Sequence, residues 1–207
     1  YIKNNWEVYG AIIIGNSCLI ILLYGLQSWV PTMLLRVYEW DLVQSGRVYG
    51  SIAMLAGSAG VLSGPFVLKY MSKINVNAPH FKLAIFGISM ASLSLVLLPF
   101  QPNVNIALVF VTMASFFVTL PLAGTSSAMV IVSPNRIRGV ITGIYVVVTS
   151  VFGLVLGPFL VASSTDFIFQ DTNAVAKSLA LVSVLVGPVG IFFMFKGINS
   201  FGEIKNV

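Results

Sequence analysis

Apolar residues occur along this chain in six long runs, and short stretches rich in polar residues, proline or glycine separate one run from the next. A helix that crosses a bilayer needs about 20 mostly apolar residues, and it satisfies its own backbone hydrogen bonds. The pattern therefore predicts an all-α integral membrane protein with six transmembrane helices. The runs cover residues 8–35, 44–68, 82–100, 104–132, 137–163 and 174–195. No break between them is long enough for a linker, so residues 1–207 are expected to form one domain.

Composition agrees with a membrane protein and argues against several other classes. Hydrophobic residues make up 57% of the chain and charged residues 8%, against about 25% charged in soluble domains. The net charge of +5 is dispersed over short loops, without the basic stretch that nucleic-acid binding requires. Cys18 and His80 are the only residues of their types, so no internal disulfide and no metal site are expected. No Asp, Glu, His or Lys lies in the middle of a run, so neither an enzyme nor a bound cofactor is predicted.

The distribution of Lys and Arg predicts the orientation in the membrane, because cytoplasmic loops carry an excess of these residues. With six crossings, one side receives both termini and the second and fourth loops. That side carries Lys3, Lys69, Lys73, Lys82, Arg136, Arg138, Lys196 and Lys205, whereas the other carries Arg36, Arg47 and Lys177. Both termini are therefore predicted to be cytoplasmic, in a plasma (inner) membrane. The chain enters an apolar run soon after Tyr1, as expected of a piece of a longer protein.

A glycine pattern in the second run recurs in the fifth. Gly46-x-x-x-Gly50 and Gly60-x-x-x-Gly64-Pro65-Phe66 return as Gly139-x-x-x-Gly143 and Gly153-x-x-x-Gly157-Pro158-Phe159, 93 residues later at all six positions. Small residues four apart let helix backbones approach closely. We therefore assign helix packing to Gly60, Gly64, Pro65, Gly153, Gly157 and Pro158.

The echo indicates a duplicated unit of three helices. Because three is an odd number, the two copies must enter the membrane from opposite sides, which gives a 3+3 inverted repeat. Many secondary transporters use such repeats to place a substrate site near the middle of the bilayer.

A 3+3 inverted repeat resembles one half of a major facilitator superfamily transporter, a fold that has two such halves. Ser28-Trp29-Val30-Pro31-Thr32, followed by Arg36 and Gly46, resembles the seventh helix of spinster-like transporters. The stretch from Ser133 to Gly139, with Gly153 to Pro158 and Asp166-Phe167, resembles the tenth to eleventh helices of that group. The resemblance implies a C-terminal half whose partner is the N-terminal six-helix half of the same transporter.

One signature of the superfamily is degenerate here. The loop motif Gly-x-x-x-Asp-Arg-x-Gly-Arg-Arg appears as the stretch from Gly64 to Lys73, with Leu68 at the acidic position and Met71 at the inner glycine. This copy therefore lacks the carboxylate of the motif, although Lys69 and Lys73 keep its positive charge.

Uncharged polar residues form stripes on three helices, because residues three, four and seven apart share a face. By the family pattern, the first and fourth helices line a central cavity, and Pro121 and Gly124 loosen the fourth. The expected cavity residues are Asn16, Tyr24, Gln27, Trp29, Ser115, Thr119, Ser126, Tyr145 and Thr149. Packing is the alternative for each Ser and Thr, and Trp29 is also suited to an interfacial anchor.

Charged residues near the helix ends are expected to act in gating and topology: Arg47, Lys69, Lys73, Arg136 and Arg138. Arg47 is equally suited to an interfacial role, paired with Glu39 or Asp41.

Taken with the resemblance, these features predict transport of a small amphipathic or lipid-like organic solute by secondary active alternating access. The expected partners are the lipid bilayer, the small-molecule substrate and the N-terminal half. The alternative is a non-transporting six-helix partner or regulatory subunit, which would use the same glycine faces. A channel is less favoured, since no ring of charge and no pore-loop signature is present.

Overall fold

The computed structural model describes residues 6–205, and they form a helical bundle that crosses the membrane six times. The prediction of an all-α integral membrane protein with six spans is confirmed. In chain order the spans are α1 (Trp6–Val37); α2 (Leu42–Ile52), η2 (Ala53–Gly57) and α3 (Ser58–Lys73); α4 (Pro79–Leu97) and η3 (Leu98–Phe100); α5 (Val104–Thr119) and α6 (Leu122–Val132); α7 (Arg138–Ser163) and η4 (Ser164–Phe169); and α8 (Val175–Lys205). Lys3 and the side chain of Lys205, both counted in the charge bias, lie outside the described part.

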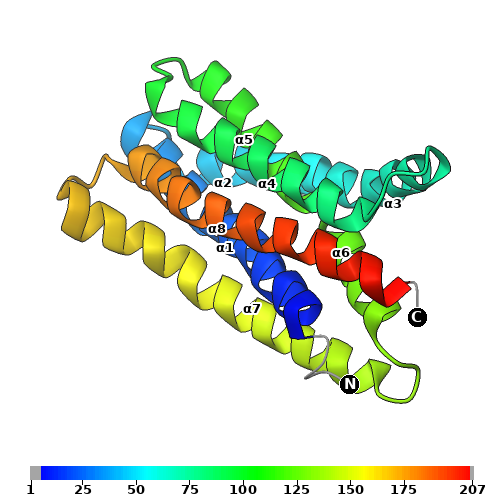
Figure 1. Ribbon diagram of the computed structural model, residues 1–207. Coiled ribbons are helices and arrows are strands. Elements are labelled where there is room, and N and C mark those ends of the chain that lie inside the picture. Colours follow the sequence, from blue (N-terminus) through cyan, green and yellow to red (C-terminus); the bar gives the residue numbers. More distant parts are fainter. Residues whose placement is uncertain (1–5, 206–207) are drawn as a thin grey trace.

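The packing of the spans follows the expected inverted repeat. The first span, α1, packs against the fifth and sixth spans, α7 and α8 (Figure 1). The fourth span, α5 and α6, packs in the same way against the second and third spans. The third and sixth spans, α4 and α8, pack against each other and join the two units. The first helix of each triplet therefore packs against the second and third helices of the other triplet.

The repeated glycines occupy equivalent positions in this arrangement. A Cβ atom added at Gly60 or Gly64 would collide with the backbone of α5 and its end, at the carbonyl oxygens of Phe116 and Leu120. At Gly157 it would collide with the Ile21 carbonyl oxygen of α1. Close backbone approach of this kind is the usual role of small residues four apart in membrane helices.

Some of the repeated glycines make no close contact within the described part of the chain. At four of the repeated glycines an added Cβ atom would meet nothing within 4 Å: Gly46, Gly50, Gly139 and Gly143. These glycines belong to the ends of the second and fifth spans that lie away from α5 and α1.

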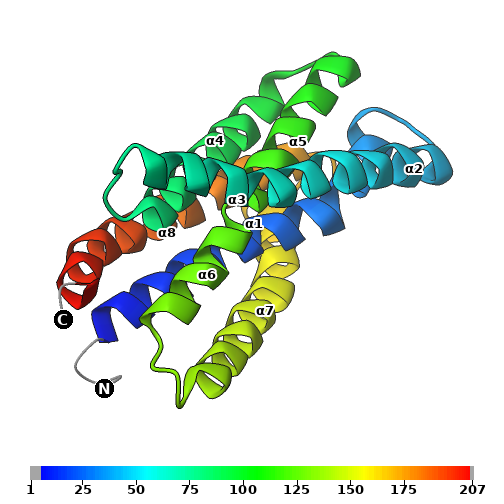
Figure 2. The ribbon, with the colours of Figure 1, turned by 90° about the vertical axis from the view of Figure 1, so that its right-hand side faces the viewer.

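The fourth span is interrupted where proline follows Leu120. Pro121 has no N–H group to donate to the Phe117 carbonyl oxygen, and the helix breaks into α5 and α6, which lie end to end in Figure 2. Gly87 of α4 packs against this carbonyl, at a distance that a side chain would not permit. The break lies beside the central face of the bundle and shapes the site described next.

Candidate functional site

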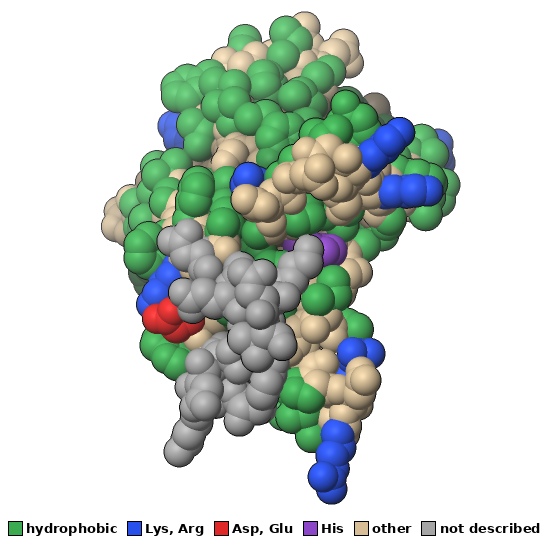
Figure 3. All heavy atoms as spheres, turned by 45° about the vertical axis from the view of Figure 1, so that its right-hand side comes forward, with side chains coloured by type: hydrophobic (Ala, Val, Ile, Leu, Met, Phe, Trp, Pro, Cys, Tyr) green, Lys and Arg blue, Asp and Glu red, His purple; other side chains and the backbone are tan. Residues whose placement is uncertain are grey.

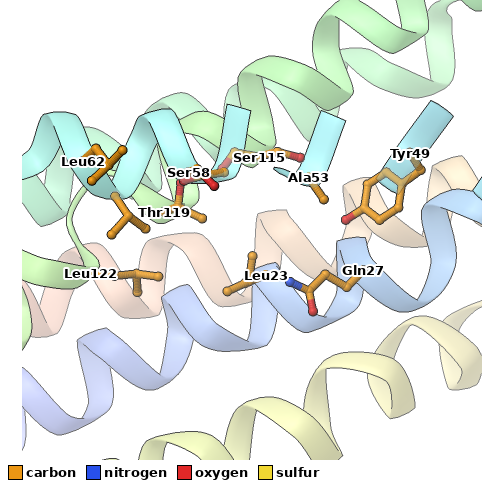
Figure 4. Close-up of a pocket in the computed structure, with 11 residues that line it drawn as sticks. Leu23, Gln27, Tyr49, Ala53, Ser58, Leu62, Ser115, Thr119 and Leu122 are labelled. Carbon is orange, nitrogen blue, oxygen red and sulfur yellow. The ribbon is translucent and has the colours of Figure 1, made fainter. Parts of the chain in front are cut away.

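A pocket of about 490 Å³ opens between the first, second and fourth spans. Its volume lies within the range of small-molecule sites, about 300–1,000 Å³. The lining residues are Leu23 and Gln27 of α1; Tyr49, Ala53, Gly57, Ser58, Val61 and Leu62 of the second span; and Ser115, Thr119 and Leu122 of the fourth (Figure 4). None of these side chains is a carboxylate, a histidine, a lysine or an arginine.

The pocket is polar at one end and apolar at the other. Figure 4 shows Gln27 and Tyr49 together at one end, on α1 and α2, and Leu62 and Leu122 at the opposite end. The Gln27 side chain is exposed, which leaves its amide free to bind a ligand. This arrangement matches a molecule that has a hydrogen-bonding group at one end and hydrocarbon at the other.

Three hydroxyl groups lie between the two ends: Ser58, Ser115 and Thr119. The Thr119 hydroxyl lies 3.0 Å from the Gly57 carbonyl oxygen and 2.9 Å from the Ser115 carbonyl oxygen, and its single proton serves either acceptor. The Ser115 hydroxyl is buried and makes no hydrogen bond within the described residues. A buried hydroxyl without a partner costs about 1–3 kcal/mol, so Ser115 is an unsatisfied polar group beside the pocket.

The second span changes helical pitch where it lines the pocket. Residues Ala53–Gly57 form a π-helix between α2 and α3, and Ala53 and Gly57 both face the pocket. Short π-helical segments are frequent at functional sites, because the extra residue per turn displaces backbone carbonyls from their usual partners. Here the Gly57 carbonyl is the one that Thr119 reaches.

Of the predicted cavity residues, the structure brings Gln27, Ser115 and Thr119 together at this pocket. Tyr24 and Ser126 lie outside it. Tyr24 packs beside Gly157 on the fifth span, and Ser126 donates back to the Leu122 carbonyl in its own helix.

Asn16 lies in a buried contact between two spans. It is 3% exposed, and its side-chain oxygen accepts a hydrogen bond of 2.7 Å from the Thr125 hydroxyl of α6. A helix in hydrocarbon directs its polar groups to whichever partner is available. Asn16 therefore joins the first and fourth spans and does not face an open cavity.

Trp29, Tyr145 and Thr149 also differ from the prediction. The Trp29 indole donates to the Pro158 carbonyl oxygen at 3.0 Å, so it links the first and fifth spans. Thr149 is 2% exposed and donates back to the Tyr145 carbonyl. Tyr145 is equally buried, with its ring inside the core.

The charged residues assigned to gating and topology lie at the ends of the spans. The side chains of Arg47, Lys69, Lys73 and Arg136 are exposed. Arg47 forms no ion pair with Glu39 or Asp41 among the described residues, and the Asp41 carboxylate caps α2 by accepting from the backbone N–H groups of Val43 and Gln44. Arg138 is half-buried at the start of α7 and donates to the Ser133 carbonyl at 3.5 Å.

Sequence reasoning missed the contribution of the second span to the pocket. Tyr49, Ala53 and Gly57 recur four residues apart, and Val61 follows at the same spacing, which is the spacing of one helical face. That signal was present, but the glycine echo on the same helix indicated packing instead.

Removal of the Thr125 hydroxyl tests the packing role of Asn16. We expect Thr125→Val to lower the free energy of unfolding by about 1 kcal/mol, since hydrogen bonds between membrane helices average about 0.6 and reach about 1.7 kcal/mol. The measurement is thermal unfolding of the purified protein. Thr112→Val is the matched control, because the Thr112 hydroxyl bonds only to Leu108 in its own helix. An equal loss of stability in both variants would contradict the cross-helix role.

The second and fifth spans are the least covered by the rest of the chain. In their most apolar 18-residue stretches, 17% and 28% of the residues are buried, against 67% in the first span. Large apolar side chains are exposed along both, among them Leu62 and Phe66, and Leu154 and Phe159.

Six spans in two interlocked triplets, with a pocket beside the first and fourth, define the fold of one half of a major facilitator transporter. Two solved structures share this fold along nearly the whole chain. Both are crystal structures of a bacterial homologue of the human lysosomal transporter Spinster, in inward-facing unoccupied and inward-facing occupied conformations. The likeness to the spinster-like group is thereby confirmed at the level of the fold.

The likeness is much stronger in structure than in sequence. The unoccupied structure matches with a TM-score of 0.77 at 14% identity, over 99% of this chain and 51% of that one. The occupied structure matches with a TM-score of 0.59 at 13% identity, over 97% and 49%. No protein-family profile and no curated protein matches the sequence. The chain therefore spans about half the length of the transporters that share its fold.

Proposed function

We propose that this chain is the C-terminal half of a spinster-like transporter, and that it carries a small amphipathic organic solute across the membrane by secondary active alternating access. The observation that carries the proposal is the pocket between the first, second and fourth spans, with Gln27 and Tyr49 at its polar end and Leu62 and Leu122 at its apolar end. The half-length match to transporters of the same fold supports it.

The exposed faces of the second and fifth spans are the surfaces that the N-terminal half would cover. In alternating access, two halves rock against each other around a fixed central site. The break between α5 and α6 supplies a flexible point next to that site. No residue that lines the described pocket is a carboxylate or a histidine. If protons drive transport, the titrating groups lie in the other half.

The test is uptake by the full-length protein in liposomes, with a panel of single-chain amphipaths and a disaccharide as the polar reference. We expect uptake of at least one amphipath and not of the disaccharide. In Gln27→Ala, loss of a hydrogen bond of about 1.4 kcal/mol should raise KM about tenfold. Gln44→Ala is the matched control, because Gln44 is exposed at the start of α2, outside the pocket.

The outcomes separate the proposal from its alternative. An unchanged KM in Gln27→Ala would remove Gln27 from the substrate site. Absence of uptake across the panel, together with a coding sequence that lacks six further apolar segments upstream of Tyr1, would favour a non-transporting membrane partner.

The orientation of the termini is part of the same proposal. The excess of Lys and Arg on the side that carries both termini supports a cytoplasmic location for them. A reporter fused to the C-terminus, active only in the cytoplasm, is expected to be active. A reporter inserted between Asp171 and Asn173, in the loop before α8, is expected to be inactive.

A further inference from the structure

A second hollow lies on the flank of the bundle, apart from the central pocket. It is a groove of about 440 Å³ between α3, α4 and α5. Val67 and Met71 form one wall, Phe86 forms the other, and Phe116 and Leu120 form the floor. It shares no lining residue with the central pocket, so a ligand here is separate from the transported solute.

The groove is apolar along its length. The rings of Phe116 and Phe117 meet edge to face with centroids 5.2 Å apart, and Phe117 meets Phe86 in the same way at 5.6 Å. The Ser63 hydroxyl at the groove donates back to the Gly60 carbonyl oxygen at 3.0 Å, so it is already satisfied. An occupant must therefore present hydrocarbon to these walls.

The remaining polar lining residue is a cation at one end. Lys82 lies in the first turn of α4, is exposed, and borders the groove. Lys69 and Lys73 lie in the last two turns of α3, which the loop 74–78 joins to α4. Among the described residues, none of these three lysines forms an ion pair with a carboxylate.

Basic side chains outnumber acidic ones on the face seen in Figure 3. Lys and Arg side chains lie at several places there, whereas the visible acidic side chains form one patch. The ion pair in the described part joins Lys196 to Glu7 at 3.3 Å, so Glu7 is already paired. Lys82 is thus the cation that borders the groove, and it forms no ion pair among the described residues.

We propose that this groove binds an anionic glycerophospholipid of the surrounding bilayer, with one acyl chain along Val67, Phe86 and Phe116 and the headgroup at Lys82. Basic pockets between transmembrane helices are suited to anionic headgroups, and apolar walls are suited to acyl chains. Leu120 forms part of the floor and precedes the break at Pro121. A bound lipid therefore supports the packing of α3 against the interrupted fourth span.

The test is native mass spectrometry of the purified full-length protein with dioleoylphosphatidylglycerol or dioleoylphosphatidylcholine. We expect about fivefold greater retention of the anionic lipid, the factor for one Lys beside an anionic surface. Lys82→Gln is expected to abolish the preference. Lys177→Gln is the matched control, because Lys177 is exposed at the opposite end of the bundle, and it should retain the preference.

A second pair of variants tests the acyl-chain position. Val67→Phe narrows the groove and is expected to reduce retention of both lipids, whereas Val184→Phe, at an exposed apolar position of α8, is expected to leave it unchanged. Equal retention of the two lipids, or a full preference in Lys82→Gln, would overturn the headgroup assignment. Unchanged retention in a folded Val67→Phe protein would overturn the groove assignment. Gln27→Ala should not alter retention, which keeps this result separate from the proposed function.

Discussion

Gly157→Leu is expected to prevent the protein from folding to a stable bundle. The added side chain would meet the Ile21 carbonyl oxygen and the Gly25 amide nitrogen of α1, which are backbone atoms that cannot turn away. Overpacking lowers the free energy of unfolding by about 1–3 kcal/mol where side chains can adjust. A larger loss is expected here, because two helix axes would have to separate. The measurement is the yield of monodisperse protein in size-exclusion chromatography, with the melting temperature of whatever remains.

The repeat supplies both a replicate and a control for this experiment. Gly64→Leu is expected to have the same effect, because Gly64 lies against the Leu120 carbonyl at the equivalent contact between the second and fourth spans. Gly143→Leu and Gly50→Leu, at repeated glycines with open space, are expected to preserve the folded yield of this chain. Equal loss in all four variants would show that the contacts of α1 and α5 are not the cause.

Ala53→Trp is expected to reduce uptake of the amphipathic solute about tenfold or more without loss of folded protein. Ala53 lines the pocket from the π-helical segment and is only partly buried, so the indole would extend into the space between Gln27 and Ser115. Lost binding of about 1.4 kcal/mol is sufficient for a tenfold effect. The measurement is the initial rate of uptake in liposomes, normalised to incorporated protein.

Val184→Trp is the matched control, since Val184 is 51% exposed on α8, away from the pocket. It should leave uptake unchanged. Normal uptake by Ala53→Trp would place the substrate path elsewhere on the bundle. A loss of uptake in both variants would point to a general effect of a bulky residue at the protein surface.

The polar stripe on the first helix illustrates where sequence reasoning reached its limit. The spacing of Asn16, Tyr24 and Gln27 predicts one cavity face, but in the structure they have three different neighbours: Thr125 of α6, the fifth span, and the pocket. The position of a polar residue along a helix determines the direction of its side chain. It does not determine which other helix lies on that side. In hydrocarbon a buried partner and an open cavity satisfy a polar side chain equally well.

The glycine pattern likewise predicts one part of the packing and leaves another part undetermined. The sequence established that Gly60, Gly64, Gly153 and Gly157 are related by repetition, and the packing assigned to them agrees with the close contacts observed. It did not separate them from Gly46 and Gly139, which follow the same spacing but have no neighbour within the chain. Spacing alone does not reveal how far along a helix its neighbour extends.

The sequence by itself determined the six spans, their alternating direction and the duplication of a three-helix unit. It did so because the thickness of the bilayer sets the length of each apolar run, and an odd number of helices inverts the second copy. Only the tertiary structure decided that the first triplet packs its leading helix into the second, that the second span widens at Ala53–Gly57, and that Tyr49 faces Gln27. Those features depend on contacts between residues far apart in the chain. Every span is similarly hydrophobic, so hydrophobicity alone does not indicate which helices are neighbours.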